Sequence, residues 1–290
     1  MDRLAIFLDD LSGGLSTFLL RETLRAASAR SDVAVVAVCV RKHKPYHRLC
    51  FQYVLKRFRR RVRRFWADVP PDRVLIPKPL DLPRLARHGR FRVVVPSSGD
   101  FNEPTFVDEL QTAVRPTMAF CLLCSQRFGP RLLETLQYPV NYHNGTLPNY
   151  RGLYATSWSL YYGEKESGYA FHRMNAEFDR GPILLEGRVP IETDILVGEL
   201  EWKKTTAAAA CLPQVLDLMV ARVPGTPQQG EGRYFSRRDF TRIQTIENPK
   251  ELSQTEIHRR LRAFGALQIY YGNRWHKVSR AEKLSRLQND

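Results

Sequence analysis

Long hydrophobic runs are missing from this sequence of 290 residues. No stretch approaches the roughly 18 to 20 uninterrupted apolar residues that a membrane-spanning helix needs. The first apolar residues, LAIFL, follow Asp2 and Arg3, whose charges cancel, and are followed directly by Asp9 and Asp10, an arrangement that a secretory signal does not have. The sequence therefore predicts no membrane span and a cytoplasmic location.

Cysteine is also scarce, and its five residues are an odd number scattered over the chain, which excludes a disulfide framework. Cys121 and Cys124 form a single CxxC. A zinc ribbon needs a second pair of ligands, and a redox CxxC normally opens a helix, whereas this one lies inside the apolar run TMAFCLLCS. We expect buried thiols on a strand and no metal site.

A GxGxxG dinucleotide fingerprint is absent, so hydride chemistry with a nicotinamide is not supported. The first strand-to-helix turn instead contains Ser12, Gly13 and Gly14. Their backbone N–H groups are candidates for binding a substrate phosphate at a helix N-terminus. A tight turn with a Ser/Thr cap explains the same residues.

Positive charge is abundant and concentrated in one segment. The formal net charge is +15, and eleven Lys and Arg residues lie between 41 and 64 without a carboxylate. Apolar residues recur at helical spacing there, which predicts a basic amphipathic helix over 41–66. Such a helix suits tRNA or other RNA, a phosphorylated substrate, an acidic partner or an anionic membrane surface. A solvated helix docked by its apolar stripe explains it equally well.

Short apolar runs alternate with helical periodicity in the first half of the chain. This alternation predicts an α/β fold with a mostly parallel sheet and helices on both of its faces. The predicted strands are 4–8, 32–40, 73–77, 92–98, 117–123 and 139–143, with helices over 15–30, 81–88, 103–113 and 128–136. Ligands bind beyond the carboxyl ends of such strands.

The second half predicts further elements and a domain boundary. A helix over 155–164, an extended segment, a strand over 183–191 and one long helix over 197–221 precede a stretch rich in Gly, Pro and Gln at 225–233. A helix over 253–264 and a hairpin with Gly272-Asn273 at its turn follow. We expect a catalytic domain over 1–224 and a small α+β subdomain over 225–290.

Two polar residues end the predicted strand 139–143. Asn141 and His143 point to the same side by the period-two rule. A carboxamide and a protonated imidazole both donate hydrogen bonds to a developing oxyanion, although a satisfied polar strand end looks the same. The other histidines show no metal-ligand spacing, namely His43, His47, His88, His172, His258 and His276.

The stretches NYHNGTLPNYRG (141–152) and HRMNAEFDRGPIL (172–184) resemble the signature of the folate-dependent formyltransferases. That signature is Asn-x-His, a Leu-Pro-x-Tyr-Arg-Gly loop and a later Asp-x-Gly, matched here by Asn141, His143, 147–152 and 179–181. The resemblance extends more weakly over the whole chain. It implies a Rossmann-like sheet of about seven strands and 10-formyltetrahydrofolate as the formyl donor.

The resemblance also assigns residues. Asn141 and His143 would polarise the formyl carbonyl, while Asp179 would pair with His143 and accept the proton of the attacking amine. Folate would bind to backbone segments, here Gln126, Arg127, Phe128, Ala176, Glu177 and Phe178. The chain departs from the usual pattern at Asn144, at 145–146 and at Arg180, which weakens any transfer of acceptor specificity.

We therefore expect an N-formyltransferase that acts on a small, anionic amine such as a nucleotide-linked amino sugar. The short C-terminal part resembles the amino-sugar enzymes, whereas the basic segment 41–64 favours a methionyl-tRNA formyltransferase. Formylation of amino acids or peptides in natural-product synthesis, hydrolysis of 10-formyltetrahydrofolate, and a silent relative that binds RNA or protein are the alternatives. The sequence leaves a homodimer open.

Overall fold

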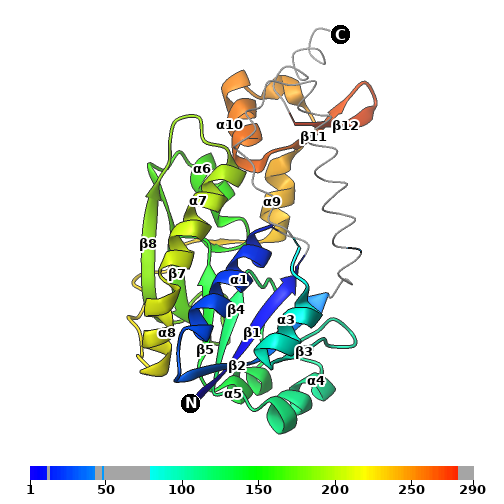
Figure 1. Ribbon diagram of the computed structural model, residues 1–290. Coiled ribbons are helices and arrows are strands. Elements are labelled where there is room, and N and C mark those ends of the chain that lie inside the picture. The colour runs from blue at the N-terminus through cyan, green and yellow to red at the C-terminus, as the bar shows by residue number, and fades with distance from the viewer. Residues whose placement is uncertain (12–13, 43–47, 49–78, 280–290) are drawn as a thin grey trace. The chain divides into compact units, whose positions relative to one another are not determined.

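The computed structural model describes residues 1–11, 14–42, 48 and 79–279 (Figure 1). The chain forms two compact units: residues 1–143, 170–185 and 205–228 belong to the first, and residues 144–169, 186–204 and 229–290 to the second. The division into 1–224 and 225–290 stays a prediction. The predicted strand 73–77, most of the basic segment 41–66, Ser12 and Gly13 lie outside the described residues.

A seven-stranded sheet with the order β3-β2-β1-β4-β5-β7-β8 organises the fold. Strands β3, β2, β1, β4 and β5 pair in parallel, and β7 pairs antiparallel with β5. The strands are β1 (Asp2–Asp10), β2 (Val33–Lys42), β3 (Arg92–Val94), β4 (Met118–Leu122), β5 (Pro139–His143), β7 (Glu166–Arg173) and β8 (Ile183–Pro190). The predicted α/β class and the number of strands are confirmed.

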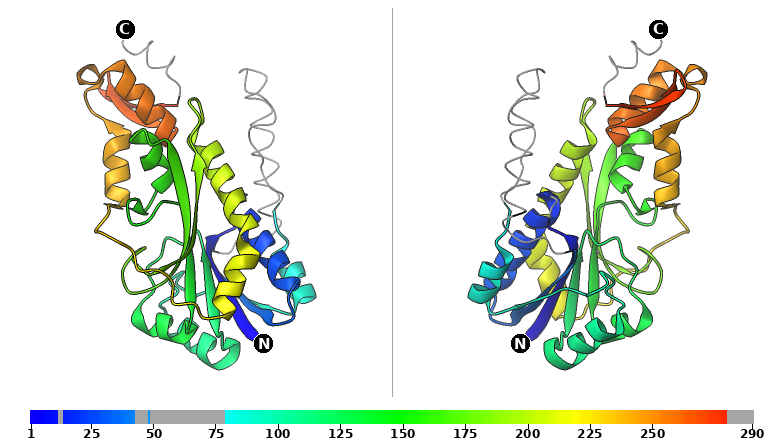
Figure 2. Two further views of the ribbon diagram at one scale, coloured as in Figure 1. Left: turned by 90° about the vertical axis from the view of Figure 1, so that its left-hand side faces the viewer. Right: turned by 90° about the vertical axis from the view of Figure 1, so that its right-hand side faces the viewer.

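Helices cover both faces of this sheet because alternate residues of its strands are apolar on each side. On one face, Phe7 packs edge-on against Phe101 and Phe128, with ring centroids 5.2 Å apart in both pairs. Helices α4 (Pro104–Glu109) and α5 (Pro130–Leu136) lie side by side over this core, with the π-helical turn η1 (Leu110–Val114) after α4 (Figure 1 and Figure 2).

The opposite face of the sheet is equally buried. Leu4, Ile6 and Leu8 of β1 have no exposed surface. Helix α1 (Gly14–Ser28) contacts β1, β2 and β4 on this side and lies beside α8 (Leu212–Val220). Helix α3 (Leu82–Gly89) begins where the Asp81 carboxylate accepts a hydrogen bond from the Arg84 amide.

Two predicted elements have to be corrected. The single helix over 197–221 is wrong: α7 (Val197–Ala210) ends before α8 begins at Leu212. Pro213 lacks the N–H that a continuous helix would bond to the preceding turn, so the helix is interrupted there. Arg41 and Lys42 are the last residues of β2 and not the start of a basic helix.

The second unit has its own aromatic core. Trp158 of α6 (Ala155–Tyr161) stacks on Phe235, with ring centroids 4.5 Å apart, and meets Phe264 edge-on at 5.2 Å. The other elements are β6 (Arg151–Gly152), β9 (Tyr234–Phe235), α9 (Arg237–Gln244), β10 (Thr245–Ile246), η2 (Pro249–Glu251), α10 (Gln254–Phe264), β11 (Leu267–Tyr271) and β12 (Arg274–Val278). Strands β10, β11 and β12 form a three-stranded sheet, which confirms the predicted small C-terminal appendage with its turn at Gly272-Asn273.

Within the described part of the chain, no helix combines the length and the apolar character that crossing a bilayer requires. The same residues contain no group of three or more His, Cys, Asp or Glu side chains gathered as metal ligands. The absence of a resident metal stays a prediction.

Candidate active site

Strand β5 carries the two polar residues singled out by the sequence to its carboxyl end. Asn141 and His143 alternate with the buried Val140 and Tyr142, so both point to the same side of the sheet. His143 is itself buried, with 6% of its surface exposed. On the neighbouring strand β7, the antiparallel register places His172 directly opposite Asn141.

Asp179 joins these side chains from the turn between β7 and β8. One carboxylate oxygen, Oδ2, lies 3.4 Å from Nδ1 of His143. The other, Oδ1, lies 3.4 Å from Nε2 of His172 and accepts a hydrogen bond of 3.3 Å from Nδ2 of Asn141. Asp179 is 9% exposed, so its contact with His143 and its hydrogen bond from Asn141 form in a site largely shielded from water, where they are stronger than in solvent.

His172 is the member of this cluster that the sequence analysis missed. Its Nδ1 lies 2.8 Å from the carbonyl oxygen of Arg173, and a carbonyl only accepts, so Nδ1 carries the hydrogen. Nε2 lies 3.1 Å from Nδ2 of Asn141, and with the ring hydrogen on Nδ1 alone it accepts a hydrogen bond from that amide. Only the pairing register of β5 and β7 places His172 beside Asn141, and the spacing of residues along the chain does not reveal it.

The turn that carries Asp179 is held in an unusual conformation. Asp179 has a φ of 53°, in the left-handed region that an aspartate tolerates better than most residues. Nε2 of Gln228 donates hydrogen bonds of 2.8 Å to the carbonyls of both Asp179 and Gly181. A Cβ at Gly181 would overlap the carbonyl oxygen of Arg173, so only glycine fits there. Gly181 and Gln228 thus fix the place of the Asp179 carboxylate.

A pocket opens beside this cluster, and we call it the strand-end pocket. Its volume is about 410 Å³, including space open to solvent. Apolar side chains form part of its wall together with the polar Asn141, His172 and Asp179; they are Cys121, Phe128, Met174 and Phe178. Seven of the twelve lining residues are polar or charged, so the pocket offers many hydrogen-bonding groups beside a smaller apolar surface.

Five of the six residues predicted to bind the folate line the strand-end pocket, namely Gln126, Arg127, Phe128, Glu177 and Phe178. The sixth, Ala176, is tied to them, because its carbonyl accepts a hydrogen bond of 2.9 Å from Nε of Arg127. The structure therefore brings the two predicted segments together at one pocket. Their part in binding folate stays a proposal.

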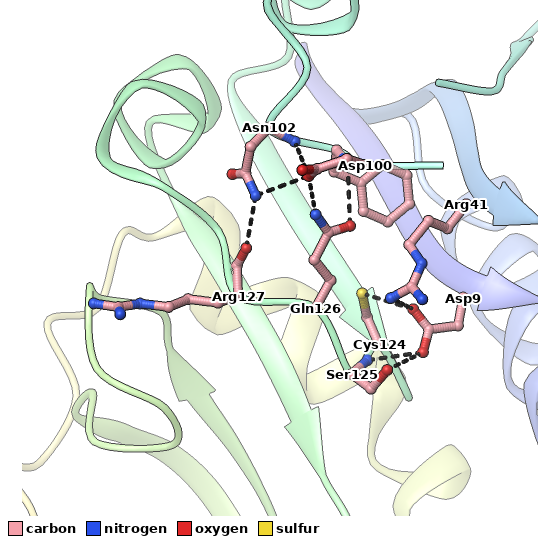
Figure 3. Close-up of polar contacts among 9 residues, drawn as sticks. Asp9, Arg41, Asp100, Asn102, Cys124, Ser125, Gln126 and Arg127 are labelled. Atoms are coloured by element: carbon pink, nitrogen blue, oxygen red, sulfur yellow. Dashed lines mark hydrogen bonds and ion pairs between the residues drawn. The ribbon is translucent and has the colours of Figure 1, made fainter. Parts of the chain in front are cut away.

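The CxxC cysteines lie next to this pocket without reactive character. Cys121 is buried in β4, as predicted, and Cys124 follows the strand and contacts Asp9 (Figure 3). Burial raises the pKa of both thiols, so they stay protonated at neutral pH. Asp9 also accepts a hydrogen bond of 3.0 Å from the Ser125 amide and pairs with Arg41 at 3.2 Å.

Of the candidate substrate-binding turn, only Gly14 belongs to the described residues, where it is the first residue of α1. Ser12 and Gly13 lie outside them. A phosphate site at this turn stays a prediction.

Comparison with known proteins relates this chain to formyltransferases. The family model described as formyl transferase matches residues 86–216. The chain is 36% identical over 98 residues to the GDP-perosamine N-formyltransferase of Brucella melitensis biotype 1, covering 34% of this chain and 38% of that protein. It is 30% identical over 149 residues to the methionyl-tRNA formyltransferase of Porphyromonas gingivalis, covering 50% of this chain and 45% of that protein. The aligned segments span less than half of either relative.

Solved structures share the fold at low sequence identity. A sugar N-formyltransferase from a Shewanella species superposes with a TM-score of 0.66 at 17% identity and covers 97% of this chain and 96% of its own. The N-formyltransferase from Helicobacter canadensis, solved with folinic acid and dTDP-3-aminofucose, superposes with a TM-score of 0.60 at 18% identity and covers 94% of this chain and 85% of its own.

Proposed function

Because the formyl transferase family model matches residues 86–216, we propose that the chain transfers a formyl group from 10-formyltetrahydrofolate to a primary amine. The acceptor we propose is a small anionic molecule of the class of nucleotide-linked amino sugars. The observation that carries the proposal is the cluster of Asn141, His143 and Asp179 beside a pocket lined by the segments 126–128 and 177–178.

The strand-end pocket suits a folate. Its apolar wall offers contact area to a flat heteroaromatic ring, and the chain segments around it present polar backbone groups for hydrogen bonds. The residues that would hold the folate are Gln126, Arg127, Phe128, Ala176, Glu177 and Phe178. When bound, the donor would supply an electrophilic formyl carbon. The amine nitrogen would form a bond to this carbon, the bond from the carbon to N10 of the folate would break, and N10 would take up a proton as tetrahydrofolate leaves.

The cluster supplies what amine attack on a formyl group requires. Negative charge develops on the formyl oxygen, and Asn141 and a protonated His143 donate hydrogen bonds to it. Asp179, 3.4 Å from Nδ1 of His143, orients that ring and favours its charged form. The same carboxylate, directly or through a water molecule, accepts the proton that the attacking nitrogen loses.

Asn141 has to exchange one partner during this reaction. Its Nδ2 atom lies 3.1 Å from Nε2 of His172 and 3.3 Å from Oδ1 of Asp179, so both amide hydrogens meet acceptors in the structure. The longer bond to Asp179 is the weaker one and is the one that the oxyanion replaces. The bond to His172 then keeps the carboxamide in its orientation.

The choice of a sugar nucleotide rests on the relatives. The Brucella protein is named for GDP-perosamine, and the Helicobacter structure holds dTDP-3-aminofucose. Both acceptors combine a primary amine with an anionic diphosphate. Arg180, one residue after Asp179 and partly exposed, adds a cation to the turn, where its Nε lies 4.0 Å from the Glu177 carboxylate.

The proposal is tested by following tetrahydrofolate formation from 10-formyltetrahydrofolate with and without a panel of amines. We expect tetrahydrofolate to form in a one-to-one ratio with formylated amine, and only slowly without an acceptor. Rapid release of formate at the same rate in the absence of any amine would instead identify a 10-formyltetrahydrofolate hydrolase.

A second acceptor class, methionyl-tRNA, is favoured by the charge distribution and by the similarity to the Porphyromonas protein. Eleven of the 45 Lys and Arg residues lie between 41 and 64, enough for several phosphate contacts. Including charged initiator tRNA in the acceptor panel separates the two classes. Formylation of the aminoacyl group on tRNA, with no activity on sugar nucleotides, would replace the sugar by tRNA in the proposal.

A further inference from the structure

We infer that Asn102 is a positioning residue for the proposed formyl donor, because its side chain holds the backbone of the pocket wall at 126–129. This inference rests on the proposed function, since it names how the same pocket is shaped. Asn102 follows Phe101 in the loop before α4 and does not itself line the strand-end pocket. It acts through the backbone of Arg127 (Figure 3) and of Gly129.

The carboxamide of Asn102 bridges two backbone groups on either side of Phe128. Its Nδ2 donates a hydrogen bond of 2.9 Å to the carbonyl of Arg127, and its Oδ1 accepts one of 2.6 Å from the amide of Gly129. A carboxamide offers a donor and an acceptor in one planar group, as a paired strand would. Residues 126–129 lie in neither a helix nor a strand, and the Asn102 side chain gives their backbone the hydrogen bonds that a neighbouring strand would otherwise supply.

The orientation of this carboxamide is fixed by a third contact. Nδ2 of Asn102 also donates a hydrogen bond of 3.0 Å to Oδ1 of Asp100. The nitrogen thus faces two acceptors and the oxygen faces an N–H, so turning the amide over would lose all three bonds. The asparagine is locked in the single orientation that pairs with the wall.

The loop 100–102 also forms hydrogen bonds with the wall at Gln126. Oε1 of Gln126 accepts a hydrogen bond of 3.1 Å from the amide of Phe101, and its Nε2 donates to Oδ1 of Asp100 (Figure 3). Between the two polar contacts, the rings of Phe101 and Phe128 pack edge-on with centroids 5.8 Å apart. The loop 100–102 and the wall 126–129 therefore form one rigid unit.

This rigidity matters because the donor is proposed to bind to backbone atoms of the wall. Without the Asn102 side chain, the carbonyl of Arg127 and the amide of Gly129 would each lose the hydrogen bond that it makes to this residue. The peptide groups on either side of Phe128 would then rotate toward water. A site built from backbone donors and acceptors loses affinity when these groups are not held in place.

The experiment compares Asn102→Ala and Asn102→Asp with the parent full-length chain. Asn102→Ala removes both bonds to the wall. Asn102→Asp keeps an acceptor for Gly129 but loses the donor to Arg127 and sets a second carboxylate beside Asp100. The matched control is Gln111→Ala, which removes a hydrogen bond of 2.9 Å between η1 and α5 away from the wall.

Folinic acid binding is measured by calorimetry, and the KM values of donor and amine are measured separately. We expect both Asn102 variants to raise the Kd of folinic acid and the KM of the donor about tenfold, equal to about 1.4 kcal/mol, with kcat within about threefold. The KM of the amine should not change. Gln111→Ala should match the parent in every value.

Folinic acid affinity within twofold of the parent in a folded Asn102 variant would overturn the inference, as would equal increases in the KM of donor and amine. Should Asn102→Ala fail to fold, Asn102→Asp, which retains the Gly129 bond, gives the same comparison. Failure of the parent to bind folinic acid at all would overturn the proposed function instead, so the two failures are distinct.

Discussion

At the scale of single residues, His172 sets the orientation of the Asn141 carboxamide. Because Nδ1 of His172 is bonded to the Arg173 carbonyl, its Nε2 accepts from Asn141 and fixes the carboxamide next to Asp179. The oxyanion donors are thus oriented before any substrate binds, which avoids the cost of arranging them during the reaction. The four side chains act as one unit, so single replacements are expected to be non-additive.

Replacing Asn141 or His143 by Ala should lower kcat by about 100-fold or more, the usual scale for losing one oxyanion donor. Folinic acid affinity should change little, because the proposed folate contacts lie on other segments. Steady-state kinetics with the best acceptor measures the effect. The control for the histidine is His88→Ala on the exposed surface of α3. Near-normal turnover of His143→Ala would refute this assignment.

Gln228 acts on the site through the backbone of the turn. Replacing Gln228 by Ala removes two hydrogen bonds of 2.8 Å that hold the carbonyls of Asp179 and Gly181. We expect kcat to fall about tenfold, or 1.4 kcal/mol, as the carboxylate moves away from His143. Gln229→Ala, at the exposed neighbouring position, is the control and should retain full activity. A Gln228→Ala enzyme with unchanged kcat would show that the turn holds Asp179 without it.

At the scale of elements, local sequence patterns predicted the strands and most helices. The same patterns could not predict contacts between residues on distant elements. The end of β5 at Asn141 and His143 followed from an apolar run that stops at polar residues. His172 and Gln228 did not follow, because they reach the site through an antiparallel register and a distant loop. The break between α7 and α8 could have been predicted from the sequence, because Pro213 is a strong local signal for the interruption of a helix.

Helix α7 carries a buried lysine near its middle. Lys204 has no exposed surface, and its Nζ donates hydrogen bonds of 2.9 Å to the Asn144 carbonyl and to Oγ of Ser167. Burial lowers the pKa of Lys204 to about 7, and the charge of Glu201 offsets only part of this effect. The unfolded chain keeps the lysine protonated up to its ordinary pKa of about 10.4.

The contribution of Lys204 to stability should therefore rise with pH above 7. Between the folded and the unfolded pKa of Lys204, the unfolded state binds more protons, so this residue contributes a slope of up to about 1.4 kcal/mol per pH unit. Below pH 7 the lysine is charged in both states and contributes no slope. Urea unfolding between pH 6 and about 8 measures this slope as the difference between the parent and Lys204→Met, because the buried thiols of Cys121 and Cys124 oppose it at higher pH.

The contribution of Lys204 should disappear in Lys204→Met. Lys203→Met is the control, because Lys203 is exposed on the same helix and pairs with Glu192. A parallel pH dependence of the parent and Lys204→Met would contradict the lowered pKa.

At the scale of the whole molecule, the net charge of +15 poses the question of the acceptor. Binding of tRNA through the segment 41–64 should weaken steeply with salt, because each neutralised phosphate adds close to one unit to the log-log slope. A sugar nucleotide engages at most a few cations and should show a shallow dependence. Replacing Arg59, Arg60 and Arg61 together by Gln should leave kcat on a small acceptor within about threefold, or about 0.65 kcal/mol. A large loss of activity, with steep salt dependence of tRNA binding, would favour tRNA.

The fate of the formyl group tests the central claim most directly. The donor is prepared with an isotopic label in its formyl carbon and incubated with the parent enzyme and an amino-sugar nucleotide, and the label is followed by NMR. Transfer through Asn141, His143 and Asp179 predicts that the label appears in a formamide on the acceptor as fast as the donor is consumed, and that His143→Ala slows both by about 100-fold. Label that collects in formate at the same rate with and without the amine would contradict the account.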